Sequence, residues 1–108
     1  MAQREKEGAK LENHPLYPVT ATDPLSPNDR LVYGLLLGTS LTLPEVKYGA
    51  GLSEERTEAS LWRLEEGGLV RQSEHDEVIY YNANWSADIR NQMPETAKWL
   101  LTNGYILA

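Results

Sequence analysis

The spacing of apolar side chains predicts a helix at the start of the central region of this chain. Leucine and valine recur there at helical intervals along residues 27–37. Ser26 suits the capping position before this segment, Pro27 suits its first turn, and Gly38 suits its end. We therefore expect a first helix over 27–37, with its apolar face turned towards a core.

Two further helices follow at short intervals. Pro44 opens a brief one, expected over 44–49, and Ser53 caps a longer one, expected over 53–66. Two glycines then stop the longer helix. With a step of about 100° per residue, its inner face carries Thr57, Leu61 and Leu64, with Ser60 at the edge.

A hairpin is expected after the third helix. Residues 69–72 and 78–81 are rich in strand-forming side chains, and the polar segment 73–77 joins them as a turn. Residues 41–43 suit a short strand that pairs with this hairpin. The fold class predicted is therefore mainly α with a small β-hairpin, ordered as a helix-turn-helix followed by a wing.

The chain divides into three parts. Residues 1–25 are charged and then rich in proline, which favours a flexible extended segment. Residues 26–83 form the winged helix-turn-helix domain, and residues 84–108 form a C-terminal helical extension. At 108 residues, the chain has room for one such domain with its tails.

The stretch from Gly51 to Val70, GLSEERTEASLWRLEEGGLV, resembles the third helix and wing entry of winged helix-turn-helix regulators such as the MarR family. The leucine-serine cap, the Leu-Glu-Glu run and the closing Gly-Leu-Val carry the likeness. The resemblance implies a transcriptional regulator that reads duplex DNA with helix 53–66. The chain departs from the family in its Pro-rich N-terminal segment, where that family has a dimerising helix.

The charge of this region opposes nucleic-acid binding. The whole chain carries −6, and the segment 44–82 holds four cationic and nine anionic side chains, or −5. The turn of the hairpin lacks the arginine or lysine that contacts the minor groove in the family. An acidic winged helix that binds a basic protein surface, and no DNA, is therefore the alternative function.

Six residues are the candidate DNA contacts: Ser53, Arg56, Ala59, Arg63, Arg71 and Lys47. Arg56 and Arg63 lie two turns apart on the outer side of the third helix, and the small Ala59 between them lets a helix approach the bases. The other interpretation is that both arginines pair with glutamates of their own solvated helix. Arg4, Lys6 and Lys10 are a possible additional arm that contacts phosphates.

Other side chains of this helix also have two interpretations. Glu54, Glu55 and Glu58 stabilise the N-terminal turns through the helix dipole, whereas on DNA each would repel phosphate. Trp62, at the boundary of the two faces, suits either an interaction anchor or packing against the wing or the first helix.

The C-terminal extension is predicted to form a homodimer. Its apolar residues exceed what a small winged domain can bury, and leftover apolar surface marks interfaces. The candidate interface residues are Trp99, Leu100, Leu101, Tyr105 and Ile106. The alternative is that this helix folds back onto the first helix of its own chain.

The sequence indicates neither catalysis nor a cofactor. Cysteine is absent, and His75 with its acidic neighbours matches no metal-binding spacing. No nucleophile elbow or phosphate loop is present, so we expect no enzyme. Apolar runs are too short to span a bilayer, and we expect a cytoplasmic protein with no membrane partner.

Overall fold

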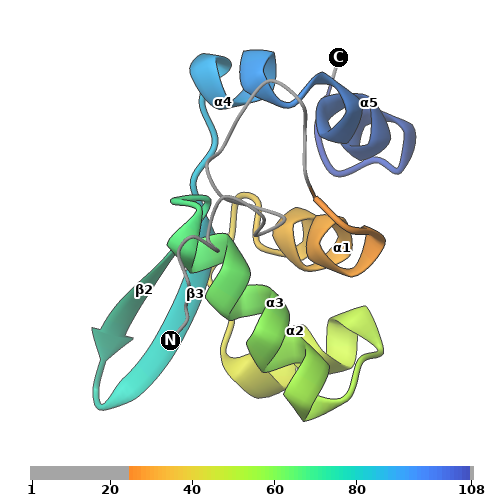
Figure 1. Ribbon diagram of the computed structural model, residues 1–108. Coiled ribbons are helices and arrows are strands. Elements are labelled where there is room, and N and C mark those ends of the chain that lie inside the picture. The colour runs from red at the N-terminus through yellow and green to blue at the C-terminus, as the bar shows by residue number, and fades with distance from the viewer. Residues whose placement is uncertain (1–24, 108) are drawn as a thin grey trace, which may run out of the picture.

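The computed structural model describes residues 25–107, so the expectations for residues 1–24 and for the arm of Arg4, Lys6 and Lys10 lie outside the described part. The elements in chain order are α1 (Pro27–Leu35), α2 (Leu43–Ala50), α3 (Glu54–Glu66), β2 (Val70–His75), β3 (Val78–Ala83), α4 (Ala87–Gln92) and α5 (Pro94–Thr102). Within residues 25–107, five helices and a two-stranded antiparallel sheet confirm the predicted fold class. Helix α1 lies between α5 on one side and the α2–α3 pair on the other, and the hairpin projects to the side (Figure 1).

Helix α1 begins as predicted and ends two residues early. Ser26 Oγ accepts a hydrogen bond from the Asp29 backbone N–H at 3.2 Å, which confirms the cap. The helix ends at Leu35 because the following residues turn towards Gly38, which has a φ of +76°. Its inward side chains form the centre of the core. The side chains with no exposed surface include those of Val32 and Tyr33, and that of Leu36 directly after the helix.

The helix-turn-helix pair also forms where the sequence predicts it. Thr42 and Glu45 make a reciprocal capping box at the start of α2. Gly51 ends α2 at a φ of +66°, a conformation that glycine adopts without strain. Ser53 caps α3, and the predicted inner face is confirmed. Its buried residues are Thr57, Ser60, Leu61 and Leu64.

The two strands of the wing are longer than expected. Residues 73–75 belong to β2 rather than to a turn, and the strands pair from Val70↔Ala83 to His75↔Val78. Asp76 and Glu77 alone make the connection, at φ values of +53° and +67°. A two-residue turn of this hand matches the twist of the strands, so main-chain hydrogen bonds extend the ladder although its side chains are polar.

The expected strand at 41–43 shortens to one bridge. Leu41 exchanges two backbone hydrogen bonds with Tyr81, at 2.9 and 2.7 Å. The predicted pairing with the wing is confirmed. Residues 42 and 43 instead begin α2, because Thr42 is its cap.

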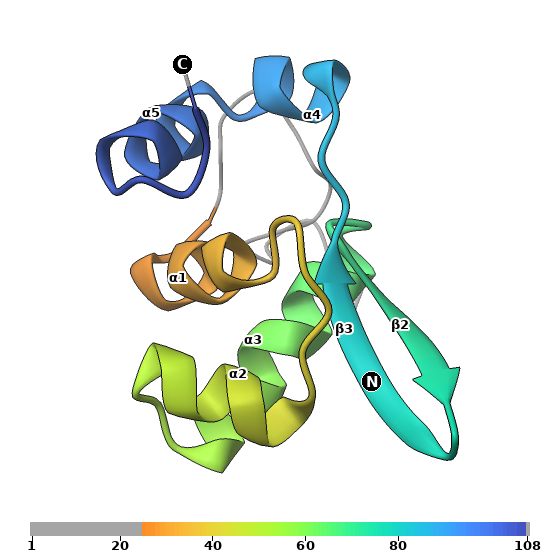
Figure 2. The ribbon, with the colours of Figure 1, turned by 180° about the vertical axis from the view of Figure 1, so that it is seen from behind.

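The C-terminal extension folds back onto α1, as both ribbon views show (Figure 2). Thr96, Ala97 and Leu100 of α5 are buried, and Arg30 Nε donates to Thr96 Oγ1 at 3.2 Å. The ring of Tyr105 covers Gly34, where a Cβ atom would lie 3.1 Å from the ring. The alternative prediction, that the C-terminal helix folds back onto the first helix of its own chain, is therefore confirmed. Over residues 25–107, no helix has the length and apolar character needed to cross a membrane.

Candidate nucleic-acid interface

The outer face of α3 is open to solvent. Its exposed residues are Glu54, Glu55, Arg56, Glu58, Ala59, Trp62 and Glu66. Arg56 and Ala59 lie there as predicted, and within residues 25–107 the Arg56 guanidinium makes no ion pair. Trp62 is 51% exposed, which favours the surface interpretation over a buried one. The face is open to a partner, and its carboxylates outnumber its one exposed cation.

Ser53 accepts two hydrogen bonds at the start of this helix. Its Oγ accepts a hydrogen bond from the Arg56 backbone N–H at 3.1 Å, and its carbonyl oxygen accepts one from Thr57 Oγ1 at 2.8 Å. Neither bond uses the Ser53 hydroxyl as a donor. Ser53 therefore fixes the first turn of α3 and keeps a donor for a contact such as a phosphate oxygen.

Arg63 does not lie outward, contrary to the sequence-based expectation. Its Nε and Nη2 donate to the two carboxylate oxygens of Asp29 in α1, at 3.0 and 2.9 Å. The Asp29 side chain has no exposed surface. Hydrogen bonding to Asp29 is the main reason why the pKa of Arg63 is raised. The arginine thus pairs with a carboxylate of another helix, not with a glutamate of its own.

The hairpin turns its two faces to different neighbours. Gln72 Nε2 donates to both carboxylate oxygens of Glu65 at 3.0 Å, so this residue faces α3. Tyr81, opposite Gln72, faces the same way: burial raises its pKa, and the nearby charges of Glu65 and Glu58 raise it further. These contacts fix the angle between wing and helix.

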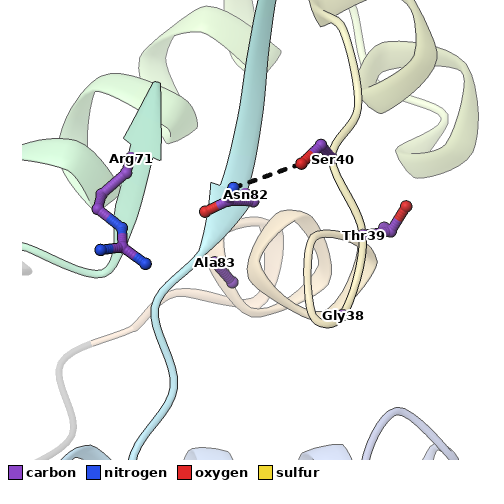
Figure 3. Close-up of a pocket in the computed structure, with 6 residues that line it drawn as sticks. All are labelled: Gly38, Thr39, Ser40, Arg71, Asn82 and Ala83. Atoms are coloured by element: carbon purple, nitrogen blue, oxygen red, sulfur yellow. Dashed lines mark hydrogen bonds between the residues drawn. The ribbon is translucent and has the colours of Figure 1, made fainter. Parts of the chain in front are cut away.

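Arg71 lies on the other face, since neighbouring residues of a strand alternate. It pairs in register with Asn82 and lines a cavity with residues 38–40, as Figure 3 shows. Arg71 is therefore separated from the outer face of α3, and the two do not form one continuous basic surface.

The tip of the wing is acidic and exposed. His75 Nε2 lies 3.8 Å from Asp76 Oδ2, and both side chains are largely solvated. Across residues 25–107, no group of three or more histidine, aspartate or glutamate side chains is arranged to hold a metal ion. The tip carries no arginine or lysine for the minor groove.

Helix α2 contributes an exposed pair beside the start of α3. Lys47 and Tyr48 line an open cavity of about 480 Å³ with Pro44, Gly51 and Leu52. Tyr48 is 90% exposed. The sequence analysis names Lys47 and does not name Tyr48, which follows it in α2.

The residues predicted to form the dimer interface differ in their exposure to solvent. Leu100 has no exposed surface, so it belongs to the core of its own chain and is not available to a partner. Trp99 stacks on Tyr105, with ring centroids 5.5 Å apart and planes 14° apart. Leu101 and Ile106 are half-buried beside them.

Neither a protein-family model nor a curated protein sequence matches this chain. Three solved structures resemble it. Reduced HlyU from Vibrio cholerae is 20% identical with a TM-score of 0.57, over 76% of this chain and 80% of that one. NolR from Sinorhizobium fredii is 16% identical with a TM-score of 0.62, over 97% and 100%.

The third is Mb0332 from Mycobacterium bovis, described as a homodimeric winged helix-turn-helix DNA-binding domain and a possible ArsR-family regulator. It is 18% identical with a TM-score of 0.60, over 96% of this chain and 91% of that one. The likeness supports the winged helix-turn-helix part of the predicted resemblance, and not the MarR family in particular. At these identities it concerns the fold, and this chain has the fold of a winged helix-turn-helix domain.

Proposed function

We propose that this protein is a DNA-binding transcriptional regulator of the cytoplasm that places α3 in the major groove of duplex DNA. The observation that carries the proposal is the outer face of α3, which projects between α2 and the wing with Arg56 and Ala59 exposed. Arg56 is suited to bidentate contact with a guanine edge, and Ala59 permits close approach.

The flanks of α3 supply contacts that position the helix. Lys47 and Tyr48 lie beside its N-terminal end, where the phosphate backbone passes an inserted recognition helix. Ser53 adds a hydroxyl there. Arg63 and Arg71 are not part of this proposed interface, since one bonds to Asp29 and the other faces away from α3.

The acidic residues set the expected strength of binding. Glu54, Glu55 and Glu58 are exposed on α3 and repel phosphates. Few cations neutralise phosphates, so we expect weak non-specific affinity with a shallow dependence on salt. Recognition then rests on base contacts by Arg56 rather than on general attraction.

We also propose that two copies associate through the surface around Trp99 and Leu101, outside the cavity that Tyr105 and Ile106 line. The similar Mb0332 domain is described as homodimeric. A two-fold axis would present two α3 helices to successive major grooves. Light scattering at micromolar concentration tests this, and a monomer with an intact fold would contradict it.

The alternative function is an acidic module that binds a basic protein surface. The pairing of Arg63 with Asp29 favours it, because Arg56 is then the one exposed cation on α3. Fluorescence anisotropy with a pool of random duplexes, at about 50 mM and about 200 mM salt, separates the two functions. Binding that weakens with salt supports the regulator, whereas no binding at the lower salt supports the alternative.

A further inference from the structure

An open cavity of about 520 Å³ lies at the base of the wing, on the side away from α3. The strand β2 supplies Arg71, helix α4 supplies Arg90, and the segment after α5 supplies Tyr105 and Ile106. Trp85 completes its apolar wall. This volume is within the range typical of small-molecule sites.

The charge of the cavity is opposite to that of the chain. The two arginines line it, and none of its described lining residues is acidic, although the whole chain carries −6. Neither Arg71 nor Arg90 makes an ion pair within residues 25–107. Two guanidinium groups without a carboxylate at one cavity favour an anion, which each can bind through two N–H groups.

A third polar group lies next to Arg71. Asn82 Nδ2 donates to Ser40 Oγ at 3.3 Å, while Asn82 Oδ1 is buried and has no hydrogen-bond partner. Figure 3 shows this amide between Ser40 and Arg71, its nitrogen turned towards Ser40. The adjoining cavity that Asn82 lines, of about 330 Å³, shares Arg71 with the larger one. A buried acceptor without a partner is suited to a donor on a ligand or a water.

We propose that this cavity binds an organic anion with an apolar body. The carboxylate lies against Arg71 and Arg90, and the apolar part lies on Trp85, Tyr105 and Ile106. The anion alone would gain nothing from the aromatic wall, and a neutral apolar molecule would gain nothing from the guanidinium groups. This site is distinct from the outer face of α3, so its test does not depend on DNA binding.

Isothermal titration calorimetry of the full chain with 4-phenylbutyrate tests the proposal. The matched probes are 4-phenylbutanol, which keeps the apolar body without the charge, and sulfate, which keeps charge without the body. We expect saturable binding of phenylbutyrate and at least about tenfold weaker binding of both other probes. Equal binding of phenylbutanol, or no binding of phenylbutyrate, would overturn the proposal.

Charge variants locate the binding. Arg71→Gln and Arg90→Gln should each weaken phenylbutyrate binding about tenfold, since each removes a charged hydrogen-bond donor. Lys98→Gln removes an exposed cation of α5 that does not line the cavity, and should leave binding unchanged. Amide chemical shifts of all variants report whether the fold is kept. Unchanged binding in both folded arginine variants would show that the cavity is not the site.

Discussion

Arg63 of α3 binds the buried carboxylate of Asp29 of α1 through two hydrogen bonds, at 3.0 and 2.9 Å. Arg63 Nη2 also lies 3.4 Å from Ser60 Oγ. The pair therefore fixes the rotation of α3 against the first helix. Arg63, which the sequence predicts to be a DNA contact, instead fixes the orientation of the outer face of α3.

Removal of this arginine should destabilise the domain. Arg63→Ala leaves the Asp29 carboxylate buried without its cation, which typically costs about 3–5 kcal/mol. Because Arg63 keeps partial contact with solvent, we expect the lower end of this range. Urea unfolding followed by circular dichroism measures the loss. Arg56→Ala, at an exposed position of the same helix, is the control and should change stability by less than about 0.5 kcal/mol.

The core side of α3 offers a second test. Leu64 has no exposed surface and packs within the central cluster. Leu64→Ala should lower the free energy of unfolding by about 2–5 kcal/mol, from lost burial and the cavity left behind. A change below about 1 kcal/mol in urea unfolding would mean that this side chain is not in the core.

The docking of the C-terminal segment depends on the absence of a side chain at Gly34. A Cβ atom there would lie 3.1–3.2 Å from three ring atoms of Tyr105. Gly34→Val should force this ring away and cost about 1–3 kcal/mol. In a Tyr105→Ala background the same substitution should cost less. If the two costs are equal, the ring does not contact Gly34 in solution.

Tyr33 makes stability fall at alkaline pH. Burial raises the pKa of this phenol above its ordinary value of 10.0, so the folded chain keeps a proton that the unfolded chain releases. The stabilisation that the buried phenol provides is complete below pH 10. Above pH 10 it declines, and the free energy of unfolding is lower by about 1.4 kcal/mol at about pH 11.

Unfolding free energies at about pH 8 and about pH 11 check this decline, and Tyr33→Phe should remove that part of it. The variant should also lose about 1 kcal/mol at neutral pH, because the hydroxyl donates to the Asn84 carbonyl at 2.7 Å. Tyr48→Phe, at a site that is 90% exposed, is the control. An equal decline in wild type and Tyr33→Phe would exclude Tyr33 as the cause.

The local parts of the fold follow from the sequence. The extent of α3, its Ser53 cap and the burial of Leu61 and Leu64 depend on spacing within a few turns, and all were predicted. The place of the wing was predicted correctly, but its two strands were predicted too short. Residues 73–75 have polar side chains and were therefore predicted as a turn, although their backbone pairs with β3.

The contacts between distant segments did not follow from the sequence. Asp29 and Arg63 are 34 residues apart, and a helical wheel of α3 alone places that arginine outside. The place of Arg71 also depends on the pleat of the wing, which Gln72 fixes by bonding to Glu65. Sequence patterns give the faces of elements, whereas these pairings depend on how the elements meet.

The most direct test of the account is the affinity of wild type, Arg56→Ala and Glu58→Gln for the same duplex DNA at about 50 mM salt. Arg56→Ala should weaken specific binding by about 1–3 kcal/mol, because a bidentate base contact is lost. Glu58→Gln should strengthen non-specific binding, because an exposed carboxylate no longer repels phosphate. Opposite shifts in the two variants would support α3 as the DNA-reading helix. Wild-type DNA binding that neither substitution changes would contradict it.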